Sequence, residues 1–352
     1  MPVTRESRRS PPPSDWLPPA WTPPAPGSPS AEPPAPPALS DVRAVARSLR
    51  RSAPGTPRAK RRTTRAATVW GEPYTGGMGT VEFESSPAES AAAAVTSGTA
   101  GRRALVRRPA RNLAEGQLTH IRRSPIDLEL AVLQWRGYVA SLEAEGWETI
   151  EVEPAPDLPD SVFIEDAVIV FGQLAVVSSP GAPSRRGETR AAEAAVRALG
   201  LSVHHLELPG TLDGGDVLKV GRTVYVGQSL RTNAEGTRQL RAILEPRGHT
   251  VVAVPITKVL HLKTAVTALP DGTVIGYRPL VDDPRVFPQF LSVPEPEGTA
   301  VVVLDPATLL MSSAAPRSAA LFTGLGYRVI TVDISEFEKL EGCVTCLSVR
   351  VR

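Results

Sequence analysis

The protein has two cysteines, Cys343 and Cys346, and both lie in one short segment near the end of the sequence. Cysteines this close along a strand-like segment rarely form a disulfide with each other, so we expect reduced thiols in a cytoplasmic protein. A thiol becomes a nucleophile when a neighbouring base or cation favours the thiolate. The segment is therefore expected to be a late strand of the core, to carry a nucleophile, or both.

A base for such a thiol is available in His261. Of the five histidines, it is the one expected to open a structural repeat, and Asp213 is a suitable partner to orient its imidazole. A single histidine or cysteine is more often structural than catalytic. The expected placement of His261 and Cys346 at equivalent positions of a repeated unit favours catalysis.

Neighbouring acids and arginines indicate a ligand with charges of both signs. Glu165 and Asp166 form a pair of carboxylates that suits a guanidinium or ammonium group, whereas Arg185 and Arg231 suit a carboxylate. An arginine-like amino acid would satisfy both. Helix caps and a surface salt-bridge network are the structural alternative. No cysteine and histidine spacing is typical of a metal site, so no metal is expected.

These residues are expected to be positioned by an internal repeat of a hairpin, a helix and a strand. The order is clearest in residues 165–208 and 215–254, and weaker copies cover residues 260–299 and 301–332. The segment 282–299 fits the pattern poorly, which leaves the outer helix of that unit open. A fifth copy would combine residues 344–351 with a helix within residues 126–145 and close a ring. Such units form radial arrays, and their polar first residues would meet at the axis.

The composition is that of a globular protein with an extension. The chain has 352 residues and a formal net charge of +2, and no apolar run is long enough for a membrane span or a secretory signal. Residues 1–100 contain proline clusters and basic runs without periodic apolar faces, so we expect a disordered extension followed by one catalytic domain, residues 101–352. A basic arm for nucleic acid is the alternative for the extension; no nucleic-acid or membrane partner is expected for the domain.

Six segments carry a more specific signal: residues 158–166 (LPDSVFIED), 180–186 (PGAPSRR), 212–216 (LDGGD), 229–233 (SLRTN), 260–263 (LHLK) and 342–346 (GCVTC). In this order they closely resemble the motifs of the dimethylarginine dimethylaminohydrolase (dimethylargininase) family. That family belongs to the guanidine-modifying enzymes of the pentein fold, a five-bladed α/β-propeller of pseudo-fivefold ββαβ repeats. The resemblance covers residues 102–351 and implies this fold.

The resemblance also implies roles for the residues at the matching positions. Cys346 would be the nucleophile, His261 the general acid and base, and Asp213 the residue that orients the imidazole. The implied substrate-binding residues are Asp160, Glu165 and Asp166 around the guanidinium, Phe163 beside it, Arg185 and Arg231 at the α-carboxylate, and the main chain at Leu340 and Gly342. Residues 113–119 would form a mobile lid.

The implied reaction converts asymmetric dimethylarginine or monomethylarginine to citrulline and dimethylamine or methylamine through an S-alkylthiouronium on the nucleophile, without a metal or organic cofactor. An arginine deiminase-type hydrolase is an alternative, although Lys263 stands where those enzymes carry an acid. A binding protein for a cationic amino acid is the non-enzymatic alternative. Cys343 departs from the family pattern and is expected to be a spectator. Oligomeric state stays open.

Overall fold

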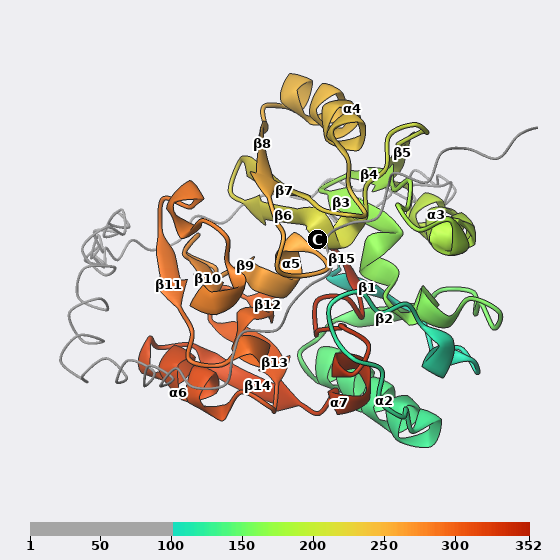
Figure 1. Ribbon diagram of the computed structural model, residues 1–352. Coiled ribbons are helices and arrows are strands. Elements are labelled where there is room, and N and C mark those ends of the chain that lie inside the picture. The colour runs from blue at the N-terminus through green and yellow to red at the C-terminus, as the bar shows by residue number, and fades with distance from the viewer. Residues whose placement is uncertain (1–100) are drawn as a thin grey trace, which may run out of the picture.

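Five three-stranded sheets surround a common axis in the computed structural model, which describes residues 101–352 (Figure 1). The expectation for residues 1–100 lies outside the described residues. Each sheet is one blade, and the chain enters the blades one after another. The predicted five-bladed α/β-propeller is confirmed.

The connectivity within a blade follows from the strand pairing. In the first blade, β3 (Val168–Phe171) and β4 (Leu174–Val177) form an antiparallel hairpin, and β5 (Ser202–His205) lies parallel to β4. Parallel neighbours need a long crossover, which α3 (Thr189–Ala198) supplies. The next blade repeats this order with β6 (Val217–Val220), β7 (Thr223–Gln228), α4 (Ala234–Leu244) and β8 (Thr250–Pro255).

The third blade departs from the pattern where the sequence matched it poorly. Its strands β9 (Val266–Ala268), β10 (Val274–Gly276) and β11 (Phe290–Ser292) are short, and the crossover contains two 3₁₀ turns, Arg278–Leu280 and Pro284–Val286, in place of an α-helix. Prolines explain the difference, because each lacks a backbone N–H and clashes with the preceding turn. The fourth blade regains the helix with β12 (Val301–Asp305), β13 (Thr308–Ser312), α6 (Pro316–Gly324) and β14 (Arg328–Val332).

The fifth blade closes the ring as predicted. β15 (Val349–Val351) pairs antiparallel with β1 (Arg103–Val106), and β2 (Glu148–Glu151) lies parallel to β1 after the crossover helix α2 (Leu128–Ala144). One expectation is corrected: the C-terminal strand begins at Val349, so Cys346 lies in the turn that precedes it. Side chains in a strand alternate between the two faces of the sheet. Cys346 lies in a turn, where this alternation does not apply, so its side chain can face the axis.

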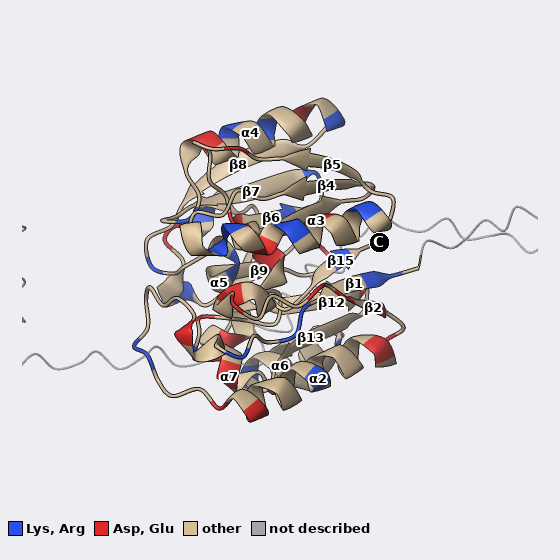
Figure 2. Ribbon diagram, turned by 90° about the vertical axis from the view of Figure 1, so that its right-hand side faces the viewer, with Lys and Arg blue, Asp and Glu red and all other residues tan. Residues whose placement is uncertain are grey.

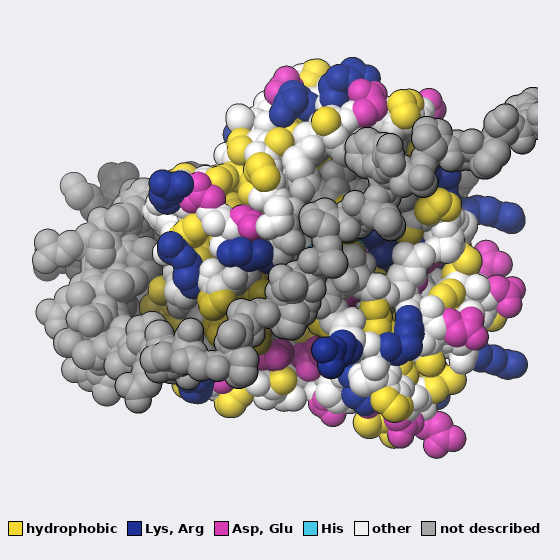
Figure 3. Space-filling model, in the orientation of Figure 1, with side chains coloured by type: hydrophobic (Ala, Val, Ile, Leu, Met, Phe, Trp, Pro, Cys, Tyr) yellow, Lys and Arg dark blue, Asp and Glu magenta, His cyan; other side chains and the backbone are white. Residues whose placement is uncertain are grey.

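Helices form the outer layer and the strands the inner one, as the side view shows for α2, α4 and α6 (Figure 2). Side chains cap the starts of α2 and α4, because Asp127 accepts from Leu130 N and Asn233 accepts from Gly236 N. Charges of both signs are interspersed over the face seen in Figure 3. Within residues 101–352, no helix combines the length and apolar character that crossing a membrane requires.

Candidate active site

The segments that begin the blades meet at the axis. The 3₁₀ turns Ile164–Asp166 and Gly214–Asp216, the start of α5 (Leu262–Ala265) and the turn after α7 (Ser335–Glu338) each contribute a polar side chain or backbone group. They enclose a cavity of about 20 Å³, room for about one water molecule. Its lining is Gln117, Asp160, Phe163, Asp166, Arg185, Arg231, Leu260, His261, Leu340, Glu341, Gly342 and Cys346.

His261 lies between two buried carboxylates. Its Nε2 is 3.1 Å from Asp213 Oδ2, and its Nδ1 is 3.9 Å from Asp166 Oδ1. The other oxygen of Asp213 accepts from the backbone N–H of Gly181. Gly215 permits this packing, since a Cβ there would lie 2.7 Å from both the Asp166 carboxylate and the His261 ring. The arrangement can orient an imidazole and hold a proton on it.

The charges around His261 favour its protonated form. Burial lowers the pKa of this imidazole, but the Asp166 charge and the hydrogen bond with Asp213 outweigh burial and raise the pKa to about 9. Burial also opposes ionisation of Asp166, yet the charges of His261 and Arg185 hold the pKa of that carboxyl below its usual range. At neutral pH the site therefore contains an imidazolium beside ionised Asp166.

Arg185 is already held by protein groups. Its Nε and Nη2 donate to the two oxygens of Glu188 at 3.0 and 2.8 Å, its Nη1 donates to Asp166 Oδ2 at 2.6 Å, and Nη2 also reaches the carbonyls of Asp160 and Phe163. The side chain is 4% exposed. It borders the cavity, but most of its donors fix the surrounding segments.

Arg231 is more open to a ligand. One terminal nitrogen, Nη2, donates to Gln117 Oε1 at 2.8 Å, while the buried Nη1 has no hydrogen-bond partner among the described residues and lies 3.6 Å from Asp213 Oδ2. A buried donor without a partner is costly unless a ligand satisfies it. Of the two arginines named from the sequence, Arg231 is thus the one with a spare donor.

Residues 113–119 lie across the cavity. The backbone N–H of Gln117 donates to both oxygens of Asp160 at 3.1 and 3.2 Å, so Asp160 holds this segment. Burial raises the pKa of the Asp160 carboxyl. Further along, the N–H groups of Thr119 and His120 donate to the two oxygens of Glu341, each at 2.7 Å. The segment therefore covers the cavity and is attached at two carboxylates.

Phe163 and the turn around Leu340 form an apolar wall. The Phe163 ring packs edge to face against Phe337, with the centroids 6.3 Å apart. A Cβ at Gly342 would lie 2.3 Å from the Phe163 ring, which explains the glycine. The N–H groups of Leu340 and Gly342 donate to Phe337 O, so these donors already have a partner.

Cys346 is 7% exposed, and its Sγ lies 3.3 Å from Cys343 Sγ. The hydrogen bond with Cys343, together with burial, raises the pKa of the Cys346 thiol above its ordinary value. Without a ligand, the thiol of Cys346 therefore keeps its proton. A bound cation would favour the thiolate in this low-dielectric setting.

The structure does not bring Glu165 to this cavity. Its carboxylate lines a separate cavity, where Oε1 is 2.6 Å from Lys263 Nζ and Oε2 accepts from Thr345 Oγ1 at 2.9 Å. Its backbone N–H donates to Cys346 O, so it supports the turn that carries the thiol. The sequence placed Glu165 and Asp166 together, whereas the 3₁₀ turn separates their side chains.

Two residues, Glu341 and Glu188, were given no role from the sequence, and Gln117 was named only as part of the expected lid. Gln117 connects the covering segment to Arg231, Glu341 holds Thr119 and His120, and Glu188 neutralises Arg185. Glu341 has φ of 60°, a conformation rare for a residue with a side chain. Its position directly before the GCVTC motif was the one available signal.

Asp166, Asp213 and His261 place one ligand atom each within 4.8 Å of one another, a spacing that a metal ion could bridge. Arg185 and the imidazolium already compensate the two carboxylates. Hydrogen bonds from Gly215 and Gly181 occupy further oxygens. The donor set therefore suits a proton-transfer site better than a metal site.

The chain is 61% identical over 251 residues to N(G),N(G)-dimethylarginine dimethylaminohydrolase of Streptomyces coelicolor, an alignment that covers 71% of this chain and 97% of the relative. It is 38% identical over 250 residues to the enzyme of the same name from Pseudomonas aeruginosa, covering 70% of this chain and 98% of that one. The chain belongs to the dimethylarginine dimethylaminohydrolase family. The model of the arginine deiminase family also matches, over residues 148–299.

Solved structures of the dimethylarginine dimethylaminohydrolase family agree with the fold. An adduct of one member with S-methyl-L-thiocitrulline has a TM-score of 0.67 and 36% identity, covering 71% of this chain and 99% of that one. The Pseudomonas aeruginosa enzyme complexed with citrulline has a TM-score of 0.66 and 36% identity, with the same coverage of both chains. The N-terminal domain of a cyanobacterial arginine dihydrolase, at 23% identity and a TM-score of 0.62, shares the fold.

Proposed function

We propose that this protein hydrolyses asymmetric dimethylarginine and monomethylarginine to citrulline and the corresponding methylamine. The observation that carries the proposal is that Cys346, His261 and Asp166 line one cavity in which Arg231 has a nitrogen without a hydrogen-bond partner among residues 101–352. A thiol, an imidazolium and a carboxylate suit attack on a guanidinium, and the spare arginine donor suits an α-carboxylate. Family membership with 61% identity to a named enzyme supports the substrate class.

The substrate would bind as a cation between Asp166 and Asp160, with its carboxylate at Arg231. A delocalised guanidinium carbon is a poor electrophile, so the protein must fix it against the sulfur and stabilise its charge. The cation would lower the pKa of Cys346, and the thiol would release its proton to solvent water as the thiolate forms. The sulfur then bonds to the guanidinium carbon and gives a tetrahedral adduct.

His261 would transfer protons in both halves of the reaction. As an imidazolium it donates its proton to the methylated nitrogen, the C–N bond breaks and dimethylamine leaves, which produces an S-alkylthiouronium on Cys346. The neutral imidazole then accepts a proton from water as the water oxygen bonds to the same carbon. Collapse of this second adduct breaks the C–S bond, passes the hydroxyl proton to the departing sulfur and releases citrulline. Asp213 would keep the ring oriented throughout, and the steps need no metal or organic cofactor.

Opening of residues 113–119 is part of the proposal. A cavity of about 20 Å³ has room for one water molecule and not for an amino acid with a guanidinium. The covering segment must therefore release Asp160 or Glu341 when the substrate enters. On this basis residues 113–119 act as the lid.

The test is a substrate panel. The purified protein is incubated with asymmetric dimethylarginine, monomethylarginine, arginine and agmatine, and citrulline and the released amines are measured. Citrulline and dimethylamine from the first substrate are expected, with loss of turnover in Cys346→Ser and most of it kept in Cys343→Ser. Full activity of Cys346→Ser would overturn the mechanism. No turnover with any compound, despite binding, would favour a binding protein.

An arginine deiminase-type activity is the second candidate, and the match of that family model over residues 148–299 favours it. It predicts ammonia from arginine as the preferred reaction. Lys263 argues for the first candidate, because it takes the place where the deiminases have an acid and is bound to Glu165 at 2.6 Å.

The proposal extends to the organisation of the chain. Residues 101–352 would be sufficient for turnover, since all residues given a role lie there, and reduced thiols at Cys343 and Cys346 fit a cytoplasmic enzyme. Activity equal in the whole chain and in a variant lacking residues 1–100 would support this division.

A further inference from the structure

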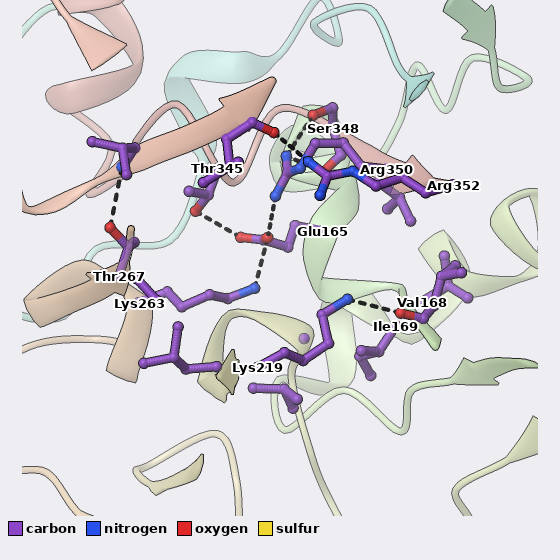
Figure 4. A pocket seen from close by; sticks show the side chains of 18 of the residues that line it. Glu165, Val168, Ile169, Lys219, Lys263, Thr267, Thr345, Ser348, Arg350 and Arg352 are labelled. Carbon is purple, nitrogen blue, oxygen red and sulfur yellow. Dashed lines mark hydrogen bonds and ion pairs between the residues drawn. The ribbon is translucent and has the colours of Figure 1, made fainter. Parts of the chain in front are cut away.

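A second cavity of about 350 Å³ lies at the axis, and it shares no lining residue with the active-site cavity (Figure 4). Residues close in sequence alternate between the two. Glu165 and Thr345 line the second cavity, whereas their neighbours Asp166 and Cys346 line the first. The two cavities therefore lie on opposite faces of one layer of backbone, and the reaction proposed above does not use the second.

Positive charge exceeds negative charge in this second cavity. Its lining contains four cationic side chains and one carboxylate, that of Glu165: Lys219, Lys263, Arg350 and Arg352. Glu165 is bound to Lys263 at 2.6 Å and lies 3.7 Å from Arg350 Nη2 (Figure 4). One carboxylate cannot neutralise four cations, so the cavity has an excess of positive charge.

Lys219 is the clearest unmatched cation. Its Nζ donates to Val170 O at 2.8 Å and lies 5.2 Å from the centre of the Phe171 ring, and within residues 101–352 it has no carboxylate partner. An ammonium group has three donors, so Lys219 keeps donors for a ligand. Lys219 is an exposed residue, and its side chain lines the cavity.

The remaining walls are apolar. Aliphatic side chains from four blades face the space between the cations, among them Val168, Ile169, Val217, Val301, Val303 and Val349. Inorganic ions gain nothing from such walls, whereas an anion with a hydrocarbon part buries it there. The combination favours a small organic anion over free phosphate.

We propose that the second cavity binds a small monocarboxylate, with its carboxylate between Lys219 and Arg350 and its hydrocarbon part against the valines. Such a ligand neutralises part of the excess charge and leaves the Glu165–Lys263 pair intact. Its volume must stay below the 350 Å³ of the cavity, which a four-carbon chain does. This site is distinct from the one that would hold the substrate carboxylate at Arg231.

Proton binding should accompany ligand binding. Burial, followed by the charges of Lys263 and Arg350, lowers the pKa of Lys219 to about 7, with Glu165 opposing and Arg352 adding to the shift. A bound carboxylate favours the charged ammonium and raises that pKa. The affinity for the anion should therefore fall as pH rises from 7 to 8.5, with proton uptake on binding near neutral pH.

The experiment is titration calorimetry of the whole protein with butyrate, phosphate and the uncharged butyramide. Butyrate is expected to bind once per chain, at least tenfold more tightly than phosphate, and butyramide is expected not to bind. Lys219→Met should weaken butyrate at least tenfold. Lys258→Met is the matched control, since Lys258 Nζ also donates to a single backbone carbonyl, that of Val281, but lies outside the cavity.

Two variants separate this site from the active site. Arg231→Met should leave butyrate binding unchanged, while its loss in that variant would assign butyrate to the active-site cavity and overturn the proposal. Arg350→Gln should lower the affinity for butyrate as Lys219→Met does. It provides the same test if the Lys219 variant does not fold. Absence of butyrate binding to the wild type, or equal binding by Lys219→Met, would also overturn it. These titrations measure no turnover, so they stand whether or not methylarginine is hydrolysed.

Discussion

The sulfur of Cys343 lies 3.3 Å from the sulfur of Cys346. The turn between them is closed by a hydrogen bond from Cys346 N to Cys343 O, which holds the thiols together. Cys343 is half-buried and Cys346 is buried. Cys343 is therefore expected to affect how Cys346 responds to oxidation, even if Cys343 takes no part in turnover.

Mild oxidation should inactivate the protein reversibly. With hydrogen peroxide as oxidant, Cys343 becomes a sulfenic acid, because it is the more exposed thiol and the hydrogen bond with Cys346 lowers its pKa; attack by the Cys346 sulfur then forms the disulfide and releases water. Dithiothreitol should restore most of the activity. In Cys343→Ser no disulfide can form, so a sulfenic acid at Cys346 would have no thiol partner and a larger irreversible loss is expected, measured by residual activity and by the mass of the peptide. Equal irreversible loss in both proteins would contradict this.

Replacing Asp213 should slow the chemical step more than it weakens binding. Asp213→Asn removes a charge 3.1 Å from His261 Nε2, so the imidazole loses orientation and the pKa of His261 falls from about 9. We expect kcat to drop by about 10²-fold or more, and steady-state kinetics together with the histidine resonance in NMR would check both effects. Asp282→Asn is the control, because Asp282 is exposed and bonds to Thr257.

The stability of the fold should depend on the charge of His261. Its folded pKa of about 9 exceeds the ordinary 6.5, so its contribution is complete below pH 6.5 and is lost as pH rises through 9. The expected contribution is up to about 3 kcal/mol. Denaturant unfolding at pH 6.5 and 9.5 measures it against His261→Gln. The pKa of Lys219 is lowered in the folded protein, so its contribution to stability changes with pH in the opposite direction. Because Lys219 is present in both proteins, the difference between their free energies of unfolding isolates the contribution of His261.

Weakening the attachment at Glu341 should affect substrate affinity. Glu341→Gln replaces an acceptor of two backbone N–H groups, each at 2.7 Å, by a weaker neutral one. If residues 113–119 are the lid, its closed state loses about 1 kcal/mol and KM rises several-fold with little change in kcat. Glu129→Gln on the exposed face of α2 is the control. An unchanged KM would show that the attachment does not limit closure.

The two arginines at the cavity should respond differently to substitution. Arg231→Lys is expected to raise KM about tenfold without lowering stability, because a lysine cannot offer the forked donors of the spare guanidinium. Arg185→Met leaves Glu188 and Asp166 buried without their partner, so a loss of about 3–5 kcal/mol in the free energy of unfolding is expected. Thermal and denaturant unfolding of both variants would distinguish these roles.

Much of the fold could be predicted because the blades repeat. The period-2 hairpins and the helices that follow them recur with glycines at the same turns, as Gly172 and Gly221 show with φ of 59° and 58°. It was harder to predict toward which of the two cavities a polar side chain points. Glu165 and Asp166 are neighbours in a 3₁₀ turn, and only the surrounding partners, Lys263 for one and Arg185 for the other, fix their directions.

The partners of the two site arginines could not be read from the sequence. Arg185 looked like a ligand-binding arginine, and its pairing with Glu188 three residues later depends on the local turn. Gln117 reaches Arg231 across 114 positions of sequence. Gln117 and Arg231 belong to no periodic pattern, so nothing in the neighbouring sequence indicated that they form a pair.

The pairing of β15 with β1 has a consequence for synthesis of the protein. Val351 pairs with Arg103, so the fifth blade needs a strand from each end of the described region. Cys346 follows the other four blades in the chain, and a ribosome therefore completes the histidine, the acids and the arginines before the thiol exists. A nascent chain holding four blades has no nucleophile to expose, and reactivity would arise in a single late event, when the last strand docks.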